Sequence, residues 1–273
     1  MKNNIQISII TLTKNDHFKF LKTLKSIEIQ KVNFYIEWLI IDGSNQKILK
    51  KNEEITKQKL FQNESIQVKH INTHKLNIEG IYPCMNYGKR VSRGLFVIFL
   101  NSGDTFFNRN SLNTFLKHSI NVSPNNSLIF GQANVIANKK INWLFPGKKL
   151  KNIKIWLKFF EPNHQSMLIS RNLANQFDFS TKYNIIGDGY WKRKILKKAD
   201  NIIYLETPLI KFFLDGVSST KPSKKIFLEL IKNKKISFFR KIVFSIKYFL
   251  PTQFFSLYYL MQKYKSYLFD LLM

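Results

Sequence analysis

The stretch "VIFLNSGDTFFN", residues 97–108, carries an apolar run directly into a short loop with one carboxylate. Asp104 is a suitable ligand for Mg²⁺ or Mn²⁺, because these hard cations prefer oxygen and bridge a carboxylate to phosphates. Asn101 adds a neutral oxygen, and Gly103 allows the backbone to come close to a ligand. The alternative is an ordinary strand-to-loop turn in which Asp104 only caps the next segment.

Two further carboxylates have comparable positions. Asp42 ends the apolar run "IEWLIID" and either faces a ligand or closes an Asx turn. Asp188 stands at the start of a helical pattern, where it would cap the helix. Asp42 and Asp104 are therefore the candidates for ligand or metal binding.

The pattern around these residues alternates strands and helices. Short β-branched or apolar runs predict strands at 5–13, 36–44, 65–72, 95–104, 127–136 and 164–170. Helical periods and capping residues predict helices at 17–30, 46–62, 83–94 and 187–199. Such alternation is typical of a parallel α/β sheet with helices on its faces. Its ligands bind beyond the carboxyl ends of the strands, which is where Asp42 and Asp104 fall.

The composition is strongly basic, with 44 Lys and Arg against 17 Asp and Glu and a formal net charge of +27. This charge implies an anionic partner, such as nucleic acid, an acidic membrane surface or a phosphorylated substrate. The lysines accompany abundant Asn and Ile, a bias that an AT-rich genome alone can produce. Cys84 is the only cysteine, which excludes an internal disulfide and favours a reducing compartment.

We expect neither a signal peptide at the start of this sequence nor a membrane-spanning helix within it. The segment "MKNNIQISIITLTKND" lacks the apolar length and the cleavage site of a signal peptide. No segment reaches the roughly 18 uninterrupted apolar residues of a spanning helix. We therefore expect a cytoplasmic protein, peripheral on the inner face of the cell membrane.

Several blocks, in their order along the chain, resemble family 2 glycosyltransferases of the GT-A fold, especially the colanic-acid-biosynthesis-like branch. They cover roughly residues 5–220 and read "SIITLTKND", "LKTLKSIEIQ", "EWLIIDGSN", "EGIYPCMNYGKRVSRGLFVIFLNSGDTF", "NHQSMLISR", "YNIIGDGYWKRKIL" and "FFLDGVSS". The resemblance implies an α/β fold of the GT-A type, with a Rossmann-like, mainly parallel sheet flanked by helices. It also implies transfer of a sugar from a nucleotide-sugar donor, with UDP the commonest nucleotide.

The resemblance also gives each matching residue a role. Asp104 would bind the divalent cation, Mn²⁺ or Mg²⁺, and Asp188 would be the catalytic base of an inverting transfer. Thr11 and Asp42 would line the nucleoside pocket, and Asn101 and Gly103 would lie beside the cation. His164 and Gln165 would lie near the diphosphate or the acceptor, and Asn86 is a further candidate contact to a ligand. A purely structural role is the alternative for His164 and Asn86.

The chain departs from the branch at several positions. The block that reads Tyr-Asp-Ala-Met-Asn-Lys-Gly in the branch has Pro83 in place of the Asp and Tyr87 in place of the Lys. Upstream, Ile78 stands where the branch often has Asp, and Glu79 is its nearest acidic neighbour. Because of these changes, the resemblance does not settle which donor the chain binds or whether it is active.

Residues 221–273 differ in character from the GT-A domain expected at 1–220. Lys and Arg alternate there with Phe, Tyr, Leu and Ile, which suits a basic amphipathic helix at an anionic membrane surface. Pro251 is expected to divide this tail into two helices. The alternative is that the apolar side of the tail packs on the domain or on a second copy in a homodimer.

Three functions remain open at this level. The first is a glycosyltransferase that acts on a surface polysaccharide or a lipid-linked oligosaccharide. The second is an inactive, nucleotide-binding scaffold of the same fold. The third is a basic nucleic-acid-binding protein, but the sequence shows no zinc spacing, RNP motif or basic recognition helix.

Overall fold

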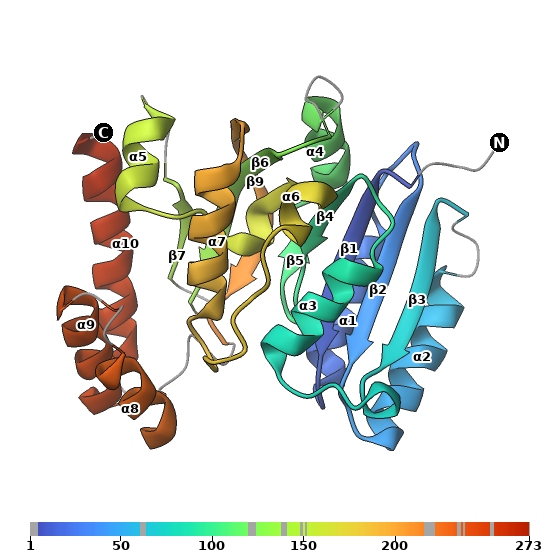
Figure 1. The fold of residues 1–273 in the computed structure, drawn as a ribbon, viewed down its shortest axis with the longest axis horizontal. Coiled ribbons are helices and arrows are strands. Elements are labelled where there is room, and N and C mark those ends of the chain that lie inside the picture. Colours follow the sequence, from blue (N-terminus) through green and yellow to red (C-terminus); the bar gives the residue numbers. More distant parts are fainter. Residues whose placement is uncertain are drawn as a thin grey trace.

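The computed structural model describes residues 5–60, 64–119, 124–137, 141–147, 150, 152–215, 222–233, 236, 238–251 and 254–272. Within these residues a single mixed sheet runs through the molecule, with helices on both of its faces (Figure 1). The strands are β1 Ile7–Thr13, β2 Ile36–Asp42, β3 Ile66–Asn72, β4 Phe96–Phe99, β5 Thr105–Phe106, β6 Ser127–Ile136, β7 Asn142–Phe145, β8 Met167–Ser170 and β9 Asn201–Phe213. The predicted α/β fold of the GT-A type is confirmed.

Strands follow the order β3-β2-β1-β4-β8-β6-β9-β5 across the sheet, and β7 pairs with β6. The first four are mutually parallel, whereas β8 runs antiparallel to both β4 and β6. The register places Thr13 opposite Asp42 and Asp42 opposite Asn72, so these strands end at one edge. The loop after β4 continues along this edge, because the Ser102 N–H donates to the Leu12 carbonyl at 3.0 Å.

The helices and 3₁₀ turns flank the sheet. Their bounds are α1 His17–Glu28, α2 Gln46–Leu60, η1 His74–Leu76, α3 Ile81–Val91, α4 Ser111–Ser119, α5 Ile153–Phe159, η2 His164–Ser166, α6 Arg171–Asn175, α7 Gly187–Lys198, α8 Lys224–Lys232, α9 Phe238–Phe249 and α10 Phe255–Leu272. Asp16 caps α1 by accepting a 3.0 Å hydrogen bond from the Lys19 N–H. Phe20 and Leu24 of α1 then pack on Trp38 of β2 in one of the cores.

A second core lies on the other face of the sheet. There Met85 of α3 and Trp191 of α7 pack with Phe99 of β4 and Phe179. Each such aromatic or aliphatic side chain contributes about 1.5–3 kcal/mol through removal from water. These two cores fix α1, α3 and α7, the helices that border the candidate site.

The C-terminal helices α8–α10, drawn in red, lie at the end of the sheet remote from β3 and α2 (Figure 1). Pro251 falls between α9 and α10 as predicted, but the described tail has three helices and not two, because α8 ends before α9 begins. Tyr259 of α10 packs with Ala133 and Trp143 of β6 and β7. None of the described helices combines the length and apolarity needed to cross a bilayer.

Candidate active site

The loop after β4 is anchored by its backbone. Gly103 donates its N–H to Thr23 Oγ1 at 3.0 Å and to the Lys19 carbonyl at 3.2 Å, which ties the loop to α1. Its φ of +102° lies in the region that favours glycine, because a Cβ there is strained. Gly103 therefore provides the turn after which Asp104 contacts β9 and η2.

Asp104 is almost completely buried, with 6% of its surface exposed. Its Oδ1 accepts a hydrogen bond from the Phe213 N–H at 3.0 Å, and its Oδ2 accepts one from Gln165 Nε2 at 3.1 Å. Burial raises the pKa of Asp104 to about 7, although the Phe213 and Gln165 donors act in the opposite direction. The carboxyl group is thus held by the fold and costs free energy when it is ionised.

Asp188 lies in the first turn of α7 and does not cap it, since Ile186 occupies the cap position. Its Oδ2 is 3.5 Å from His164 Nδ1, and its Oδ1 is 3.4 Å from the Tyr82 hydroxyl. The same hydroxyl accepts the Gly187 N–H at 2.9 Å. Asp188 keeps 28% of its side chain exposed, so a ligand can reach it.

The pKa of Asp188 is shifted in the opposite direction from that of Asp104. Burial would raise it, but the His164 imidazole and the Lys192 ammonium outweigh burial and hold the pKa of Asp188 well below its usual range. Asp188 is therefore a permanent carboxylate at neutral pH.

The turn η2 connects the two carboxylates. Its first residue, His164, faces Asp188 with one ring nitrogen and lies 3.5 Å from Asn101 Nδ2 with the other. Its second residue, Gln165, contacts Asp104. Four residues that sequence reasoning assigned to the site therefore form one continuous group with Asp188.

Two buried oxygens in this group matter for cation binding. Within the described part of the chain, neither Asn101 Oδ1 nor Gln165 Oε1 has a hydrogen-bond partner. Amide and carboxylate oxygens are the ligands that Mg²⁺ and Mn²⁺ prefer. No group of three or more His, Cys, Asp or Glu residues in the described chain could hold a metal by itself. Asp104 and the amides of Asn101 and Gln165 could therefore hold a cation only together with ligands from outside the protein.

Thr11, Asp42 and Asn86 lie outside this group. Thr11 Oγ1 is buried between the Leu100 carbonyl at 2.7 Å and Trp38 Nε1 at 2.9 Å. The Asn86 amide bonds the Phe179 backbone through both its oxygen and its nitrogen. These two side chains connect elements of the fold, and the contacts of Thr11 with a nucleoside and of Asn86 with a ligand remain predictions.

Asp42 has no exposed surface. Its Oδ1 accepts the Ser44 N–H at 2.8 Å, and its Oδ2 accepts Asn52 Nδ2 at 2.8 Å and pairs with His70 Nε2 at 3.0 Å. Burial would raise its pKa, but the His70, Asn52 and Ser44 contacts outweigh burial and lower it. Asp42 is thus held inside the fold.

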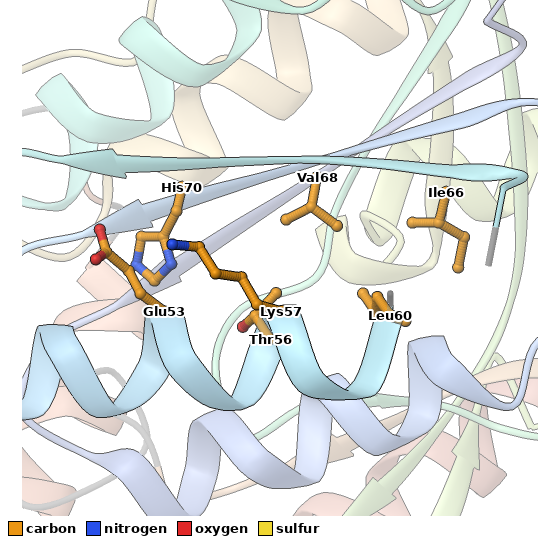
Figure 2. A pocket seen from close by; sticks show the side chains of 7 residues that line it. All are labelled: Glu53, Thr56, Lys57, Leu60, Ile66, Val68 and His70. Atoms are coloured by element: carbon orange, nitrogen blue, oxygen red, sulfur yellow. The ribbon is translucent and has the colours of Figure 1, made fainter. Parts of the chain in front are cut away.

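His70 also borders an open groove of about 500 Å³ between α2 and β3. Figure 2 shows His70 beside Glu53 and Lys57 at one end of the groove, and Leu60 and Ile66 at the other end. The lining contains neither Asp104 nor Asp188. The groove is therefore separate from the candidate active site.

Sequence reasoning missed three polar neighbours of the two carboxylates. Lys192 lies four residues after Asp188 on one face of α7, so helical spacing could have indicated this pair. Lys19 approaches Asp104 from α1, and it also pairs with Asp215 at 3.3 Å. The contact of Tyr82 with Asp188 spans 106 residues and has no local signal.

The resemblance also included the segment Gly216–Ser218, which lies outside the described residues. Ile78 precedes α3, and Pro83 lies within the first turn of this helix, which begins after Gly80 at φ +97°. A proline is tolerated there, because the first N–H groups of a helix have no partner within it.

No family model matches the chain, and no curated protein matches it. Several solved structures, however, are similar to the chain. TarS from S. aureus is 15% identical at a TM-score of 0.60, over 89% of this chain and 43% of that one. TarS 1–349 in complex with UDP-GlcNAc is 16% identical at a TM-score of 0.61, over 93% of this chain and 76% of that one.

The mannosyltransferase PcManGT from Pyrobaculum calidifontis, solved with GDP-Man and Mn²⁺, is 14% identical at a TM-score of 0.51. The match covers 84% of this chain and 61% of that one. At these identities the comparisons show the fold. The chain spans less than half of that first TarS chain, and the colanic-acid-biosynthesis-like branch remains a prediction.

Proposed function

We propose that this chain is a glycosyltransferase that moves a sugar from a nucleotide-diphosphate donor to a hydroxyl of a glycan, with inversion at the anomeric carbon. The observation that carries the proposal is the continuous group of Asp104, Gln165, His164 and Asp188, which offers an accessible base beside a buried set of oxygen ligands. Proteins of similar fold bind UDP-GlcNAc or GDP-Man, which makes these the first donors to test.

The residues of the proposed cation site are Asp104, Asn101 and Gln165. A divalent cation bound there would neutralise the negative charge that develops on the departing diphosphate. Lys19, which lies beside Gly103 and Asp104, adds positive charge at the same place. These groups would hold the donor so that its anomeric carbon faces Asp188.

Asp188 would act as the base. The acceptor oxygen forms a bond to the anomeric carbon, the bond to the phosphate oxygen breaks, and the hydroxyl proton passes to Asp188. A carboxylate with a low pKa is a weak base, so it accepts the proton only as the new bond makes that proton acidic. His164 and Tyr82 hold the carboxylate in position, and Lys192 keeps it ionised.

The test is turnover by Asp188→Asn, measured as nucleotide released from UDP-GlcNAc or GDP-Man with Mn²⁺. Loss of a general base lowers turnover by about 10²–10⁴-fold, while nucleotide binding is retained. Asp200→Asn, at an exposed position, is the matched control. Full turnover by Asp188→Asn would refute the proposed base.

A separate measurement tests the cation site. UDP with Mn²⁺ should raise the melting temperature of the wild type more than UDP alone, because the cation joins the carboxylate to the diphosphate. Asp104→Asn should lose the additional increase. If Asp104→Asn leaves the additional increase in melting temperature unchanged, the cation binds elsewhere.

We further propose that the C-terminal helices hold the enzyme on an anionic membrane surface, where a lipid-linked acceptor resides. Helix α9 exposes Phe238, Ile242, Ile246 and Phe249, which share one helical face. Helix α10 exposes Leu257, Met261 and Tyr264 in the same way. Lysines on both helices add attraction to anionic headgroups, worth about 1 kcal/mol each near such a surface.

Vesicle binding tests this surface. Phe238→Asp should weaken sedimentation with phosphatidylglycerol vesicles about tenfold, because it removes a large apolar side chain and adds a repelled charge. Phe18→Asp is the matched control, since Phe18 is 82% exposed on the distant helix α1 and Phe238 is 80% exposed. Equal losses in both variants would indicate a general charge effect and contradict a dedicated face.

A further inference from the structure

A second cavity, of about 440 Å³, lies between the sheet and the C-terminal helices. Its walls come from β6, β7 and β9, the segment before η2, α7, α9 and α10. Trp143, Tyr258 and Tyr259 give it aromatic sides, and Lys192, Lys247 and Lys265 give it three cations. Two of these lysines and both tyrosines belong to the tail, so the cavity is complete only with α9 and α10 in place.

The cavity carries an excess of positive charge. Glu161 is the carboxylate in its lining, and it pairs with Lys192 at 3.5 Å and with Arg193 at 2.7 Å. Lys247 is 7% exposed, and burial lowers its pKa to about 8. Three lysines around one cavity favour binding of an anion that carries several negative charges, such as a diphosphate.

The cavity also adjoins the proposed active site. Asn163 in its wall immediately precedes His164, which contacts Asp188. Lys192 in its wall lies close enough to Asp188 to lower the pKa of that carboxyl. A molecule in this cavity would therefore approach the proposed base from the side of the tail.

We infer that this cavity binds the diphosphate headgroup of a lipid-linked acceptor. Lys192, Lys247 and Lys265 would neutralise the diphosphate, and the aromatic walls would pack on the groups attached to it. The exposed apolar faces of α9 and α10 would place the lipid chain at the membrane surface. The assignment as an acceptor site rests on the proposed transferase function, whereas the binding of a prenyl diphosphate does not.

The test is calorimetric titration of the full chain with geranyl diphosphate, with and without saturating UDP. We expect binding that UDP does not abolish. Lys247→Gln and Lys265→Gln should each weaken it about tenfold, the usual loss for one charge-assisted hydrogen bond. Lys241→Gln, which removes the same charge from α9 outside the lining, is the matched control and should bind as the wild type does.

Several results would overturn the inference. Loss of binding on addition of UDP would place the diphosphate at the donor site. Equal affinity for geraniol would show that the cavity recognises only apolar groups, and equal affinity for inorganic phosphate would show that no lipid is needed. Unchanged binding by Lys265→Gln, whose side chain is exposed, would count against the cavity even if Lys247→Gln failed to fold.

The two proposals can fail separately. Binding that depends on Lys247 and Lys265 in a chain with no donor turnover would support the cavity and refute the transferase function. Donor turnover that depends on Asp188, without binding of geranyl diphosphate, would do the reverse.

Discussion

Asp42 and Asp188 are held in different ways. Asp42 has no exposed surface and accepts short contacts, 2.8–3.0 Å, from Ser44, Asn52 and His70. Asp188 is 28% exposed, and its contacts with His164 and Tyr82 are long, at 3.5 and 3.4 Å. Short contacts without exposure fix a carboxylate within the fold, whereas long contacts and open surface leave one available to a substrate.

Asp104 combines features of both. It is buried like Asp42, but the amide oxygens of Asn101 and Gln165 beside it have no partner among the described residues. Unsatisfied buried oxygens cost free energy in the absence of a ligand, which is typical of a site built for binding. The comparison therefore separates one carboxylate that is held by short contacts inside the fold from the two for which we propose chemical roles.

The largest expected effect on stability comes from Asp42→Ala. Three donors from β3, α2 and the loop after β2 would lose their acceptor inside the protein, which should lower the free energy of unfolding by about 3–5 kcal/mol. Urea denaturation measures this loss. Asp200→Ala, at an exposed position, should cost much less. If Asp42→Ala leaves stability unchanged and instead abolishes UDP binding, the nucleoside role predicted from the sequence is correct.

The loss of stability caused by Asp42→Ala should depend on pH in a defined direction. Because the pKa of Asp42 is lowered in the folded state from an ordinary value of 3.8, its contribution is complete above that pH. It is lost as the pH falls through the folded pKa. The stability difference between the wild type and Asp42→Ala should therefore be constant near neutral pH and shrink in acid below about 3.8.

Asp104→Asn should have the opposite effect and stabilise the chain. The pKa of Asp104 is raised from 3.8 to about 7 in the folded state, so the wild type loses stability as the pH rises through this interval. The neutral variant avoids that cost and should be more stable at pH 8 by about 1–3 kcal/mol. Denaturation at pH 5 and pH 8 measures whether the advantage grows with pH. A less stable variant at pH 8 would mean that the carboxylate is ionised at little cost.

The sequence predicted the elements more completely than the contacts between them. Runs of β-branched residues located the first strands, and the predicted strand at 127–136 agrees with β6 at both ends. The expected strand at 164–170 is a 3₁₀ turn followed by β8, because Asn163 accepts the Gln165 N–H and tightens the chain there. The hydrophobic periodicity of a sequence does not reveal such a hydrogen bond between a side chain and the backbone.

The candidate site shows the same limit. Sequence motifs brought Asn101, Asp104, His164, Gln165 and Asp188 into consideration, and the fold places these residues together. Motifs could not show that His70, which lies 28 residues after Asp42, would form a hydrogen bond with the Asp42 carboxylate. Contacts between distant segments depend on tertiary packing, which local sequence patterns do not reveal.

The smallest effect is expected from Tyr82→Phe, which tests whether the long contacts of Asp188 matter. The variant keeps the ring that stacks on Phe179 but removes the hydroxyl that accepts the Gly187 N–H and lies 3.4 Å from Asp188. We expect a loss of about 1 kcal/mol in stability and a fall of about five- to tenfold in kcat. KM for the donor should stay unchanged, because Tyr82 would position the base without touching the donor.

Tyr35→Phe is the matched control and should change neither constant, because Tyr35 precedes β2 at the end of the strand opposite Asp42. A purely structural role for Tyr82 would lower stability and leave kcat of the folded protein intact. In that case the carboxylate of Asp188 would owe its position to His164, and the long contact with Tyr82 would be incidental. A fall in kcat without a change in KM would instead place Tyr82 with His164 among the residues that orient the base, although Tyr82 and Asp188 lie 106 positions apart in the chain.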